Sequence, residues 1–367
     1  MRRSVAWALV LLTVAGTAAS ATARRGTTAA EALQPALNAV VASGTPGALV
    51  LVEDGTSRMQ VESGLAELRG GVPLRAGDRF RAGSITKTFV AVVVLQLVRE
   101  GRLSLDDTLE RRLPGFVPNG RRVTIRQLLA HTSGLSDYVA DERFLRLTAS
   151  APRRHWSPRE LVRRAERMGP TGSPGETFAY ASTNYVLLGL VVERVTGTTI
   201  GEQLRSRIFA PLGLRGTDFV PDAWTGGRYV HGYVPSVHDG IVGSLATARD
   251  RSDASASWAW AAGALVSTAS DLSRFFGALL GGQLLPPRLV ELMRPAPSRR
   301  YGLGLAAFET PCGRAVGHTG NLLGTVSAAW STADGRRRVV AMTNSYPLSA
   351  AADTAFRRLL DAAFCRR

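Results

Sequence analysis

One apolar stretch limits the folds that this 367-residue chain can adopt. From Thr88 to Val98 the residues are apolar on nearly every side of a helix, which is typical of a helix buried in a core. Gly101 follows as a stop signal. The whole chain is 45% hydrophobic and 20% charged, so it can build a core around such a helix. The sequence therefore predicts a globular protein with this helix inside it.

The first turn of this helix carries the only lysine of the chain, Lys87; all other cationic side chains among the 45 Lys+Arg residues are arginines. Arginine stays protonated in proteins, whereas burial can make a lysine neutral. Ser84 lies three residues earlier, so its hydroxyl is within reach of the Lys87 amine on a helix. The free N–H groups of the helix start could also stabilise an oxyanion. We predict a nucleophilic serine; the alternative is a capping Ser84 and a solvated Lys87.

The N-terminus has the pattern of a secretory signal peptide over residues 1–23. Arg2 and Arg3 precede an apolar segment, 5–14, and small-residue cleavage sites end at Ala21 and Ala23. The apolar segment is too short to span a membrane. We expect an exported protein of the cell envelope without a membrane span, and both the general and the twin-arginine export routes stay open.

Charge and cysteine content narrow the possible partners. The formal net charge is +16, but the arginines are dispersed, whereas a nucleic-acid interface needs a basic stripe with aromatic side chains. We therefore expect no nucleic-acid partner.

Cys312 and Cys365 are either a disulfide, as export would allow, or two free thiols. The two cysteines and five histidines show no ligand spacing for zinc, so we expect neither a metal nor a cofactor.

Hydrophobic patterns and turn residues divide the chain into an interrupted sheet and a helical part. We predict an α/β sheet domain from residues 24–102 and 255–367, a mainly helical domain from residues 103–254, and an active site in the cleft between them. The expected strands cover residues 48–52, 59–65, 301–305, 315–319, 326–330 and 338–342. Further helices are expected at residues 27–42, 123–130, 158–168, 186–195, 201–209, 271–280 and 350–364. Residues 239–243 are predicted as a loop, and residues 249–251 as a charged exposed turn.

Four motifs in this order resemble those of the serine penicillin-recognising enzymes. They are Ser84-Ile85-Thr86-Lys87, LLAHTSGL at 128–135, FAYASTNY at 178–185, and His318-Thr319-Gly320. Among these enzymes the chain resembles the secreted D-alanyl-D-alanine carboxypeptidases, which are related to class C β-lactamases. This resemblance implies a β-lactamase/transpeptidase-like fold, with an antiparallel sheet flanked by helices and an inserted helical lobe.

The resemblance also implies roles for the motif residues. Ser84 would be the acylated nucleophile and Lys87 its base. Tyr180 would be the alternative base, if its neighbours Lys87 and His318 favour the phenolate as cations. Ser182 replaces the usual asparagine of this motif and supports the site with a shorter side chain. Asn184 would belong to the helix that follows, and His131 to the structural part of its motif.

His318, Thr319 and Gly320 would lie on a strand at the edge of the cleft. Thr319 would bind the substrate carboxylate, and Gly320 would let the substrate backbone come close. The backbone N–H groups of Asn321 and Ser84 would form the oxyanion hole. Trp258 would either line the cleft or pack in the core. The arginine that helps carboxypeptidases hold a terminal carboxylate is missing from residues 306–308, and Arg314 is out of register.

These expectations favour a monomeric D-alanyl-D-alanine carboxypeptidase. It would act on peptidoglycan stem peptides through an acyl-serine intermediate and would be acylated by β-lactams. A class C-like β-lactamase, an esterase or a D-aminopeptidase on the same scaffold are the alternatives. A further alternative is a non-catalytic sensor of β-lactams or cell wall.

Overall fold

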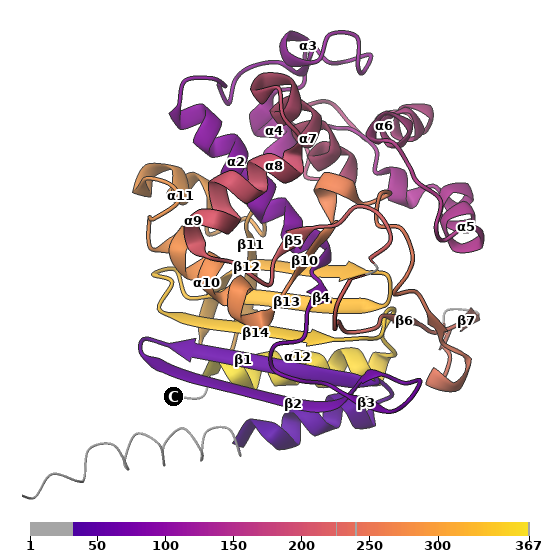
Figure 1. The fold of residues 1–367 in the computed structure, drawn as a ribbon. Helices are drawn as coiled ribbons and strands as arrows, with labels where there is room; N and C mark the ends of the chain where they lie inside the picture. Colours follow the sequence, from indigo (N-terminus) through magenta and orange to yellow (C-terminus); the bar gives the residue numbers. More distant parts are fainter. Residues whose placement is uncertain (1–31, 225, 239–240, 366–367) are drawn as a thin grey trace, which may run out of the picture.

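The computed structural model describes residues 32–224, 226–238 and 241–365. The predicted signal peptide, 1–23, lies outside these residues. Within them the centre is one antiparallel sheet of seven strands in the order β11-β12-β13-β14-β1-β2-β3, covered by helices on both faces (Figure 1). The predicted sheet is confirmed. Its strands are β1 (Gly47–Asp54), β2 (Ser57–Glu67), β3 (Val72–Pro73), β11 (Ala306–Thr310), β12 (Gly313–Leu322), β13 (Thr325–Ser331) and β14 (Arg337–Thr343).

Strand β1 shows how the sheet separates two cores. Its side chains alternate between the two faces: Leu49 and Leu51 pack into the larger core, and Val50 and Val52 into a second one. A helix over residues 32–42 and the terminal helix α12 (Ala350–Cys365) cover the second core. Helix α10 (Ala269–Leu280) packs on the opposite face, where the larger core lies. The strand is therefore apolar on both of its faces.

The apolar helix of the sequence is α2 (Thr86–Arg99), and it is buried over nearly its whole length. It runs from the sheet into a helical part of the molecule, where it packs against α7 and α8 (Figure 1). Capping boxes that start at Thr124, Ser157 and Thr199 explain where three of these helices begin. The helices between residues 109 and 212 are α3 (Leu109–Arg112), α4 (Ile125–Leu129), α5 (Glu142–Ser150), α6 (Pro158–Arg167), α7 (Ser182–Thr196), α8 (Ile200–Leu204) and α9 (Ala210–Leu212). The domain boundaries near residues 102 and 254 stay a prediction.

One expected strand position was wrong. Residues 301–305 do not form a strand; apart from one bridge between Tyr301 and Ala306, β11 begins at Ala306. Before the chain rejoins the large sheet at β11, it forms β10 (Leu265–Ser267), which pairs with β4 (Phe80–Arg81) and β5 (Asp218–Phe219). The small sheet ties the segment before Ser84 to both ends of the 219–265 region.

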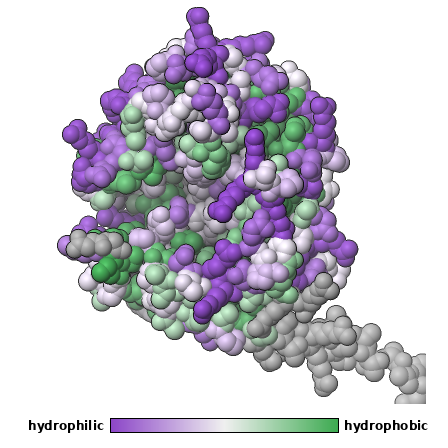
Figure 2. Space-filling model, turned by 180° about the vertical axis from the view of Figure 1, so that it is seen from behind, coloured by the Kyte–Doolittle hydropathy of each residue, from purple (hydrophilic) through white to green (hydrophobic). Residues whose placement is uncertain are grey.

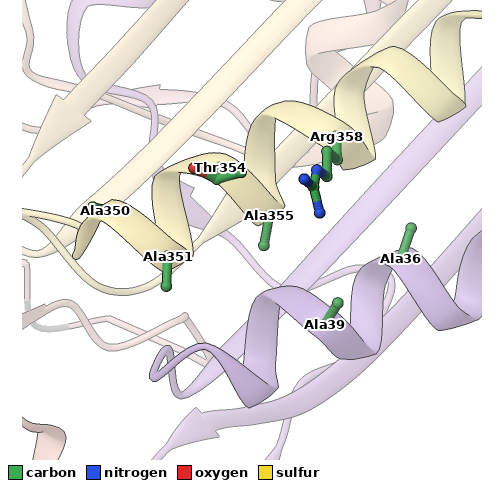
Figure 3. A pocket seen from close by; sticks show the side chains of 7 residues that line it. All are labelled: Ala36, Ala39, Ala350, Ala351, Thr354, Ala355 and Arg358. Atoms are coloured by element: carbon green, nitrogen blue, oxygen red, sulfur yellow. The ribbon is translucent and has the colours of Figure 1, made fainter.

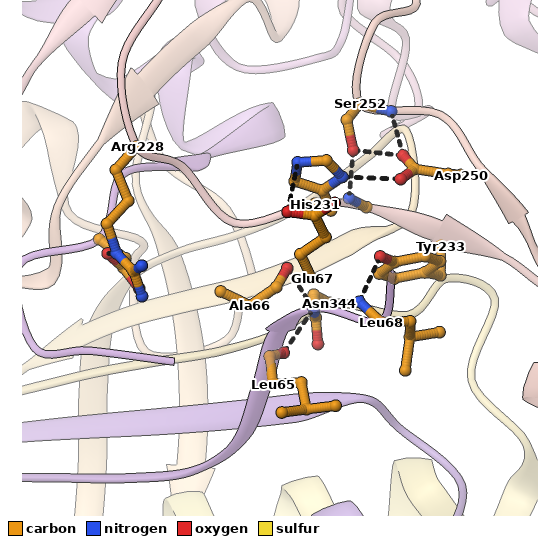
Figure 4. Close-up of polar contacts among 12 residues, drawn as sticks. Leu65, Ala66, Glu67, Leu68, Arg228, His231, Tyr233, Asp250, Ser252 and Asn344 are labelled. Carbon is orange, nitrogen blue, oxygen red and sulfur yellow. Dashed lines mark hydrogen bonds and ion pairs between the residues drawn. The ribbon is translucent and has the colours of Figure 1, made fainter. Parts of the chain in front are cut away.

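Residues 229–252 contain short strands, and two of these fall in the segments predicted as a loop, 239–243, and as an exposed turn, 249–251. Strands β6 (Tyr233–Val234) and β9 (Arg249–Asp250) pair, as do β7 (Val237–His238) and β8 (Ile241–Val242). Residues 239–240 of the predicted loop lie outside the described residues. Asp250 is no free surface charge, because its carboxylate lies 2.7 Å from Nδ1 of His231 and thereby raises the pKa of that imidazole (Figure 4).

Tyr233 anchors this segment beside the strand that edges the site. Its hydroxyl accepts a hydrogen bond from the backbone N–H of Leu68 (Figure 4). Its own backbone N–H donates to the carbonyl of Gly324, in the turn between β12 and β13, and to that of Asn344. The segment thus braces the end of β12.

Cys312 and Cys365 form a disulfide, which confirms the first of the two sequence alternatives. The bridge joins the residue before β12 to the last residue of α12, with a sequence separation of 53. Closing a loop of this length in the unfolded chain stabilises a protein by roughly 4 kcal/mol.

Reduction should therefore lower the melting temperature by roughly 5–10 °C. Thermal unfolding with and without dithiothreitol measures the effect. The Cys312→Ser/Cys365→Ser variant is the control, because its melting temperature should be low and insensitive to reductant. Equal melting temperatures for the oxidised protein and this variant would show that the bridge adds no stability.

Hydrophilic and apolar residues are mixed on one face of the molecule. Figure 2, which views the molecule from behind, shows hydrophilic residues spread over this face with smaller apolar patches between them. Within the described part of the chain, every helix is too short or too polar to cross a bilayer.

A pocket lies between the helix at residues 32–42 and α12 (Figure 3), on the face of the sheet that holds the second core. It bears no reactive group, and we assign no function to it. Its lining residues are Ala36, Ala39, Ala350, Ala351, Thr354, Ala355 and Arg358.

Candidate active site

Ser84 and Lys87 touch, as their spacing predicted. Ser84 lies in a short 3₁₀ turn, η1 (Gly83–Ile85), which leads directly into α2. The Lys87 Nζ atom is 2.9 Å from the Ser84 Oγ atom and 2.8 Å from the carbonyl oxygen of Ala262. The Lys87 side chain is fully buried. The alternative of a solvated lysine is therefore wrong.

Burial sets the protonation state of this amine. Removing the ammonium from water lowers the pKa of Lys87 to about 7, and the carboxylate of Asp137 partly opposes that shift. A neutral Lys87 can donate one hydrogen bond to the Ala262 carbonyl and still accept the proton of the Ser84 hydroxyl. A sizeable fraction of the molecules at neutral pH thus contains a base in contact with the hydroxyl.

Two glycines bring the Ser84 turn against strand β12. Gly83 has φ +54°, and a Cβ atom there would lie 2.7 Å from the backbone nitrogen of Asn321. A Cβ atom at Gly320 would lie 1.9 Å from the carbonyl oxygen of Ala82. Any larger residue would push the turn and the strand apart. The backbone of Asn321 is consequently next to Ser84, as an oxyanion hole of their two N–H groups requires; that role stays a prediction.

Strand β12 has a free edge beside this turn. Its partner β11 pairs along it only as far as the match of Ala306 with Gly317. From His318 to Leu322 the strand pairs with β13 on its other side alone. Thr319 and Asn321 are exposed there, whereas His318 and Gly320 are buried. The predicted strand through His318, Thr319 and Gly320 is therefore present, and its free edge can receive an extended substrate. The cleft that it was expected to edge stays a prediction.

Tyr180 lies over the amine. Its ring centroid is 4.9 Å from the Lys87 Nζ atom. Part of the ring is exposed, but its hydroxyl lies against Ser84 inside the site. Burial raises the pKa of Tyr180, and the hydrogen bond with Ser84 only partly opposes the shift. The expectation that neighbouring cations favour the phenolate is wrong; Tyr180 is a neutral phenol and a better proton donor than base at neutral pH.

His318 is not a cation either. Burial and the nearby Lys87 lower the pKa of His318 to about 3, so its imidazole is neutral at pH 7. Its Nδ1 atom faces the carbonyl of Thr319, and its Nε2 atom lies 3.0 Å from the hydroxyl of Tyr301. With the proton on Nδ1, Nε2 accepts the hydrogen bond from Tyr301. His318 thus holds the strand and Tyr301 together, an arrangement that the motif alone did not reveal.

His131 supports Tyr180, although it was left out of the predicted site. Its ring stacks on Tyr180 with a centroid distance of 4.2 Å. Its Nδ1 atom accepts a hydrogen bond from the backbone N–H of Ala181 at 3.1 Å and lies 3.1 Å from the amide nitrogen of Asn184. The signal in the sequence was its place in LLAHTSGL, but stacking between distant segments is not readable from a motif.

The remaining predicted residues differ in burial and in their contacts. Asn184 is buried and hydrogen-bonded to Ser133, so it is structural, as expected. Ser182 is the first residue of α7, two positions after Tyr180, and is partly exposed. Trp258 is half-buried; its ring lies 6.4 Å from that of Phe144, and it packs against the core. Its predicted contact with substrate stays untested. Among the described residues no cluster of His, Cys, Asp and Glu could hold a metal ion.

Two curated proteins have sequences similar to this chain. A D-aminopeptidase from Brucella anthropi is 31% identical over 313 residues, which are 82% of this chain but 56% of that protein. Penicillin-binding protein 4* from Bacillus subtilis is 27% identical over 335 residues, 81% of this chain and 68% of its own length. The chain thus spans little more than half of the D-aminopeptidase.

Two solved structures are similar to this chain along nearly their whole length. A D-stereospecific amidohydrolase from Streptomyces sp. is 36% identical with a TM-score of 0.81, covering 92% of this chain and 98% of the other. The D-amino acid amidase from Ochrobactrum anthropi SV3, complexed with L-phenylalanine amide, is 28% identical with a TM-score of 0.78, covering 91% and 98%.

The sequence also matches the β-lactamase protein family over residues 29–364. This match includes every motif residue described above. The chain therefore belongs to the β-lactamase family, a family of serine hydrolases that includes penicillin-binding proteins.

Proposed function

We propose that this protein is a D-stereospecific amidohydrolase. It would cleave the amide bond on the carboxyl side of a D-amino acid that has a free amino group. The similarity to the Streptomyces D-stereospecific amidohydrolase carries the proposal, because it extends over 98% of that chain at 36% identity. The names of the D-aminopeptidase and the D-amino acid amidase point to the same chemistry.

The mechanism follows from the contacts around Ser84. Neutral Lys87 accepts the Ser84 proton while the Oγ atom attacks the amide carbonyl. The N–H groups of Ser84 and Asn321 stabilise the oxyanion of the tetrahedral intermediate. Tyr180, a neutral phenol hydrogen-bonded to Ser84, donates a proton to the leaving nitrogen, and Lys87 returns its proton to the phenolate. Water then hydrolyses the acyl-serine by the reverse proton path.

A D-alanyl-D-alanine carboxypeptidase is the second candidate, favoured by the similarity to penicillin-binding protein 4*. It must hold a terminal carboxylate. Arg314 cannot do so, because it is bound to Glu309 and to backbone carbonyls at 296, 297 and 299. His318 is neutral, so it supplies no charge either. Thr319 is left as a neutral partner, which makes this substrate a weaker fit.

Four substrates separate the candidates. The p-nitroanilides of D-alanine and L-alanine, a D-alanyl-D-alanine peptide and nitrocefin are assayed with the same enzyme preparation. The proposal expects turnover of the D-anilide at least tenfold above that of the L-anilide. Release of D-alanine from the peptide with no anilide cleavage would establish the carboxypeptidase. Fast nitrocefin turnover would identify a β-lactamase. A stable penicillin adduct together with no turnover of any of the four substrates would identify a sensor.

Export remains part of the proposal. Residues 1–23 predict it, and an enzyme of this class in the envelope would have access to peptides with D-amino acids. Detection of a chain that starts after Ala21 or Ala23 in the cell-free medium or the envelope fraction, with loss of export when residues 1–23 are deleted, tests this point.

A further inference from the structure

One carboxylate beside the reactive pair has no counter-ion. Asp137 immediately precedes the 3₁₀ turn η2 (Tyr138–Ala140), and within the described residues it forms no ion pair with an arginine, lysine or histidine. Asp141, four residues on, is paired with Arg164. Lys87 is the cation whose charge acts on Asp137, so a carboxylate in this partly buried place can take a cationic ligand as its partner when Lys87 is neutral.

The fold holds this carboxylate next to the Tyr180 motif. The Asp137 Oδ1 atom accepts a hydrogen bond from the backbone N–H of Val139 at 3.2 Å. The backbone N–H of Ser182, two residues after Tyr180, also donates to the carboxylate. Thr183 locks the arrangement, since its hydroxyl donates to the carbonyl of Ser136 at 2.7 Å. The carboxylate therefore lies at the start of α7, at the same end of the helix as Tyr180.

The charge of Asp137 affects the pKa values of the catalytic groups. It raises the pKa of Lys87 against the larger effect of burial, and it adds to the increase in the pKa of Tyr180. The other ionisable side chains at the site are neutral at pH 7, since burial lowers the pKa of His318 and of His131. With Lys87 in its neutral form, the site is negative, which favours a cationic substrate.

Ser182 makes room beside this charge. Similar enzymes usually have an asparagine at this position, and the serine side chain is shorter. The Ser182 side chain is partly exposed, and its hydroxyl makes no hydrogen bond to another described group of the protein. The Ser182 hydroxyl is thus a free acceptor on the residue whose backbone N–H contacts the Asp137 carboxylate.

We propose that Asp137 binds the α-ammonium group of the substrate, with the Ser182 hydroxyl as a second acceptor. This inference rests on the proposed function and specifies its substrate: the amine must be free and adjacent to the scissile carbonyl. In such a substrate the ammonium nitrogen is two bonds from the carbon that Ser84 attacks. Its binding partner must therefore lie beside the Ser84–Tyr180 contact, on the side of α7 where Asp137 is held.

A purely structural role for Asp137 predicts a different result. As a cap of η2 it would stabilise the turn whatever the substrate is. Asp137→Asn keeps a side-chain oxygen for the Val139 N–H and removes the charge. A structural defect would lower all activities together, whereas loss of ammonium binding affects amine substrates alone. The matched control is Asp141→Asn, which neutralises a capping carboxylate of α5 in the same part of the fold.

The test compares kcat/KM for the p-nitrophenyl esters of D-alanine and of propionic acid, which differ in the ammonium group and are both reactive enough to follow. For wild type we expect a strong preference for the D-alanine ester. Asp137→Asn should lower kcat/KM for this ester by about 10- to 100-fold, as for loss of a charge-assisted hydrogen bond, and change the propionyl ester less than threefold. Ser182→Asn should lower the ratio of kcat/KM for the D-alanine ester to kcat/KM for the propionyl ester. Asp141→Asn should leave this ratio unchanged.

The outcomes separate the two proposals. If wild type hydrolyses D- and L-alanine esters equally and shows no amine preference, the proposed function fails. If wild type prefers the D-alanine ester but Asp137→Asn retains that preference, the function stands and the role of Asp137 is wrong. A melting temperature within a few degrees of wild type shows that a variant is folded. If Asp137→Asn does not fold, the ratio of the two kcat/KM values for Ser182→Asn decides between the outcomes.

Discussion

Replacing Ser84 by alanine should abolish acylation and hydrolysis together. Removing the nucleophile of a serine hydrolase costs up to about 10⁶-fold in kcat, and any residual rate comes from binding and the oxyanion hole. The protein should fold normally, because the Oγ atom contacts Lys87 and Tyr180 but no core residue. Incubation with a fluorescent penicillin, followed by mass spectrometry of the intact protein, measures the loss.

Wild type should gain the mass of one penicillin, on the peptide that contains Ser84. Ser136 is a useful control, since it is a buried serine whose hydroxyl donates to the Gly169 carbonyl away from Lys87. Ser136→Ala should still be labelled. Labelling of Ser84→Ala at the wild-type level would place the nucleophile elsewhere and refute the site.

Replacing Lys87 by arginine should reduce acylation by at least about 10³-fold although the formal charge is kept. Arginine cannot become neutral at any pH at which the protein is folded, so it cannot accept the Ser84 proton. Stopped-flow or gel-based penicillin labelling gives the acylation rate. An arginine variant within tenfold of wild type would show that the amine only orients Ser84.

Because a buried guanidinium could disturb the fold, Lys87→Met is the companion variant. Methionine has a similar length and no charge. Keeping a lysine neutral at pH 7, when its pKa is about 7 instead of 10.5, costs about 4 kcal/mol. Lys87→Met avoids this cost but leaves the Ala262 carbonyl without its donor. We expect a variant that is inactive yet at least as stable as wild type in chemical denaturation.

Local patterns were enough to predict much of this fold and part of the site. The contact between Ser84 and Lys87 depends on helical spacing, and the burial of α2 depends on an apolar run, so both are local properties of the sequence. The sheet strands that alternate between two cores, such as β1 and β14, were also readable. The place of His318 on a cleft-edge strand followed from the resemblance to known enzymes.

Properties that arise between distant segments could not be predicted. The pKa of Tyr180 depends on how deeply its hydroxyl is buried against Ser84, and no motif encodes that depth. His318 was expected to carry charge, but its contact with Tyr301 comes from a stretch that was expected to be a strand. Asp137 stood next to a recognised motif and was overlooked, because its lack of a counter-ion is visible only when the surrounding side chains are placed.

The pH dependence of acylation tests the central claim most directly. Lys87 must be deprotonated to accept the Ser84 proton, and its pKa is about 7. The rate of labelling of wild type by fluorescent penicillin should therefore rise with pH, reach half its maximum near pH 7, and fall about tenfold per unit below pH 6. The histidines at the site stay neutral across this range, since burial lowers the pKa values of His131 and His318. A rate that is flat from pH 5 to 9, or that rises only above pH 9, would contradict a buried neutral lysine as the base.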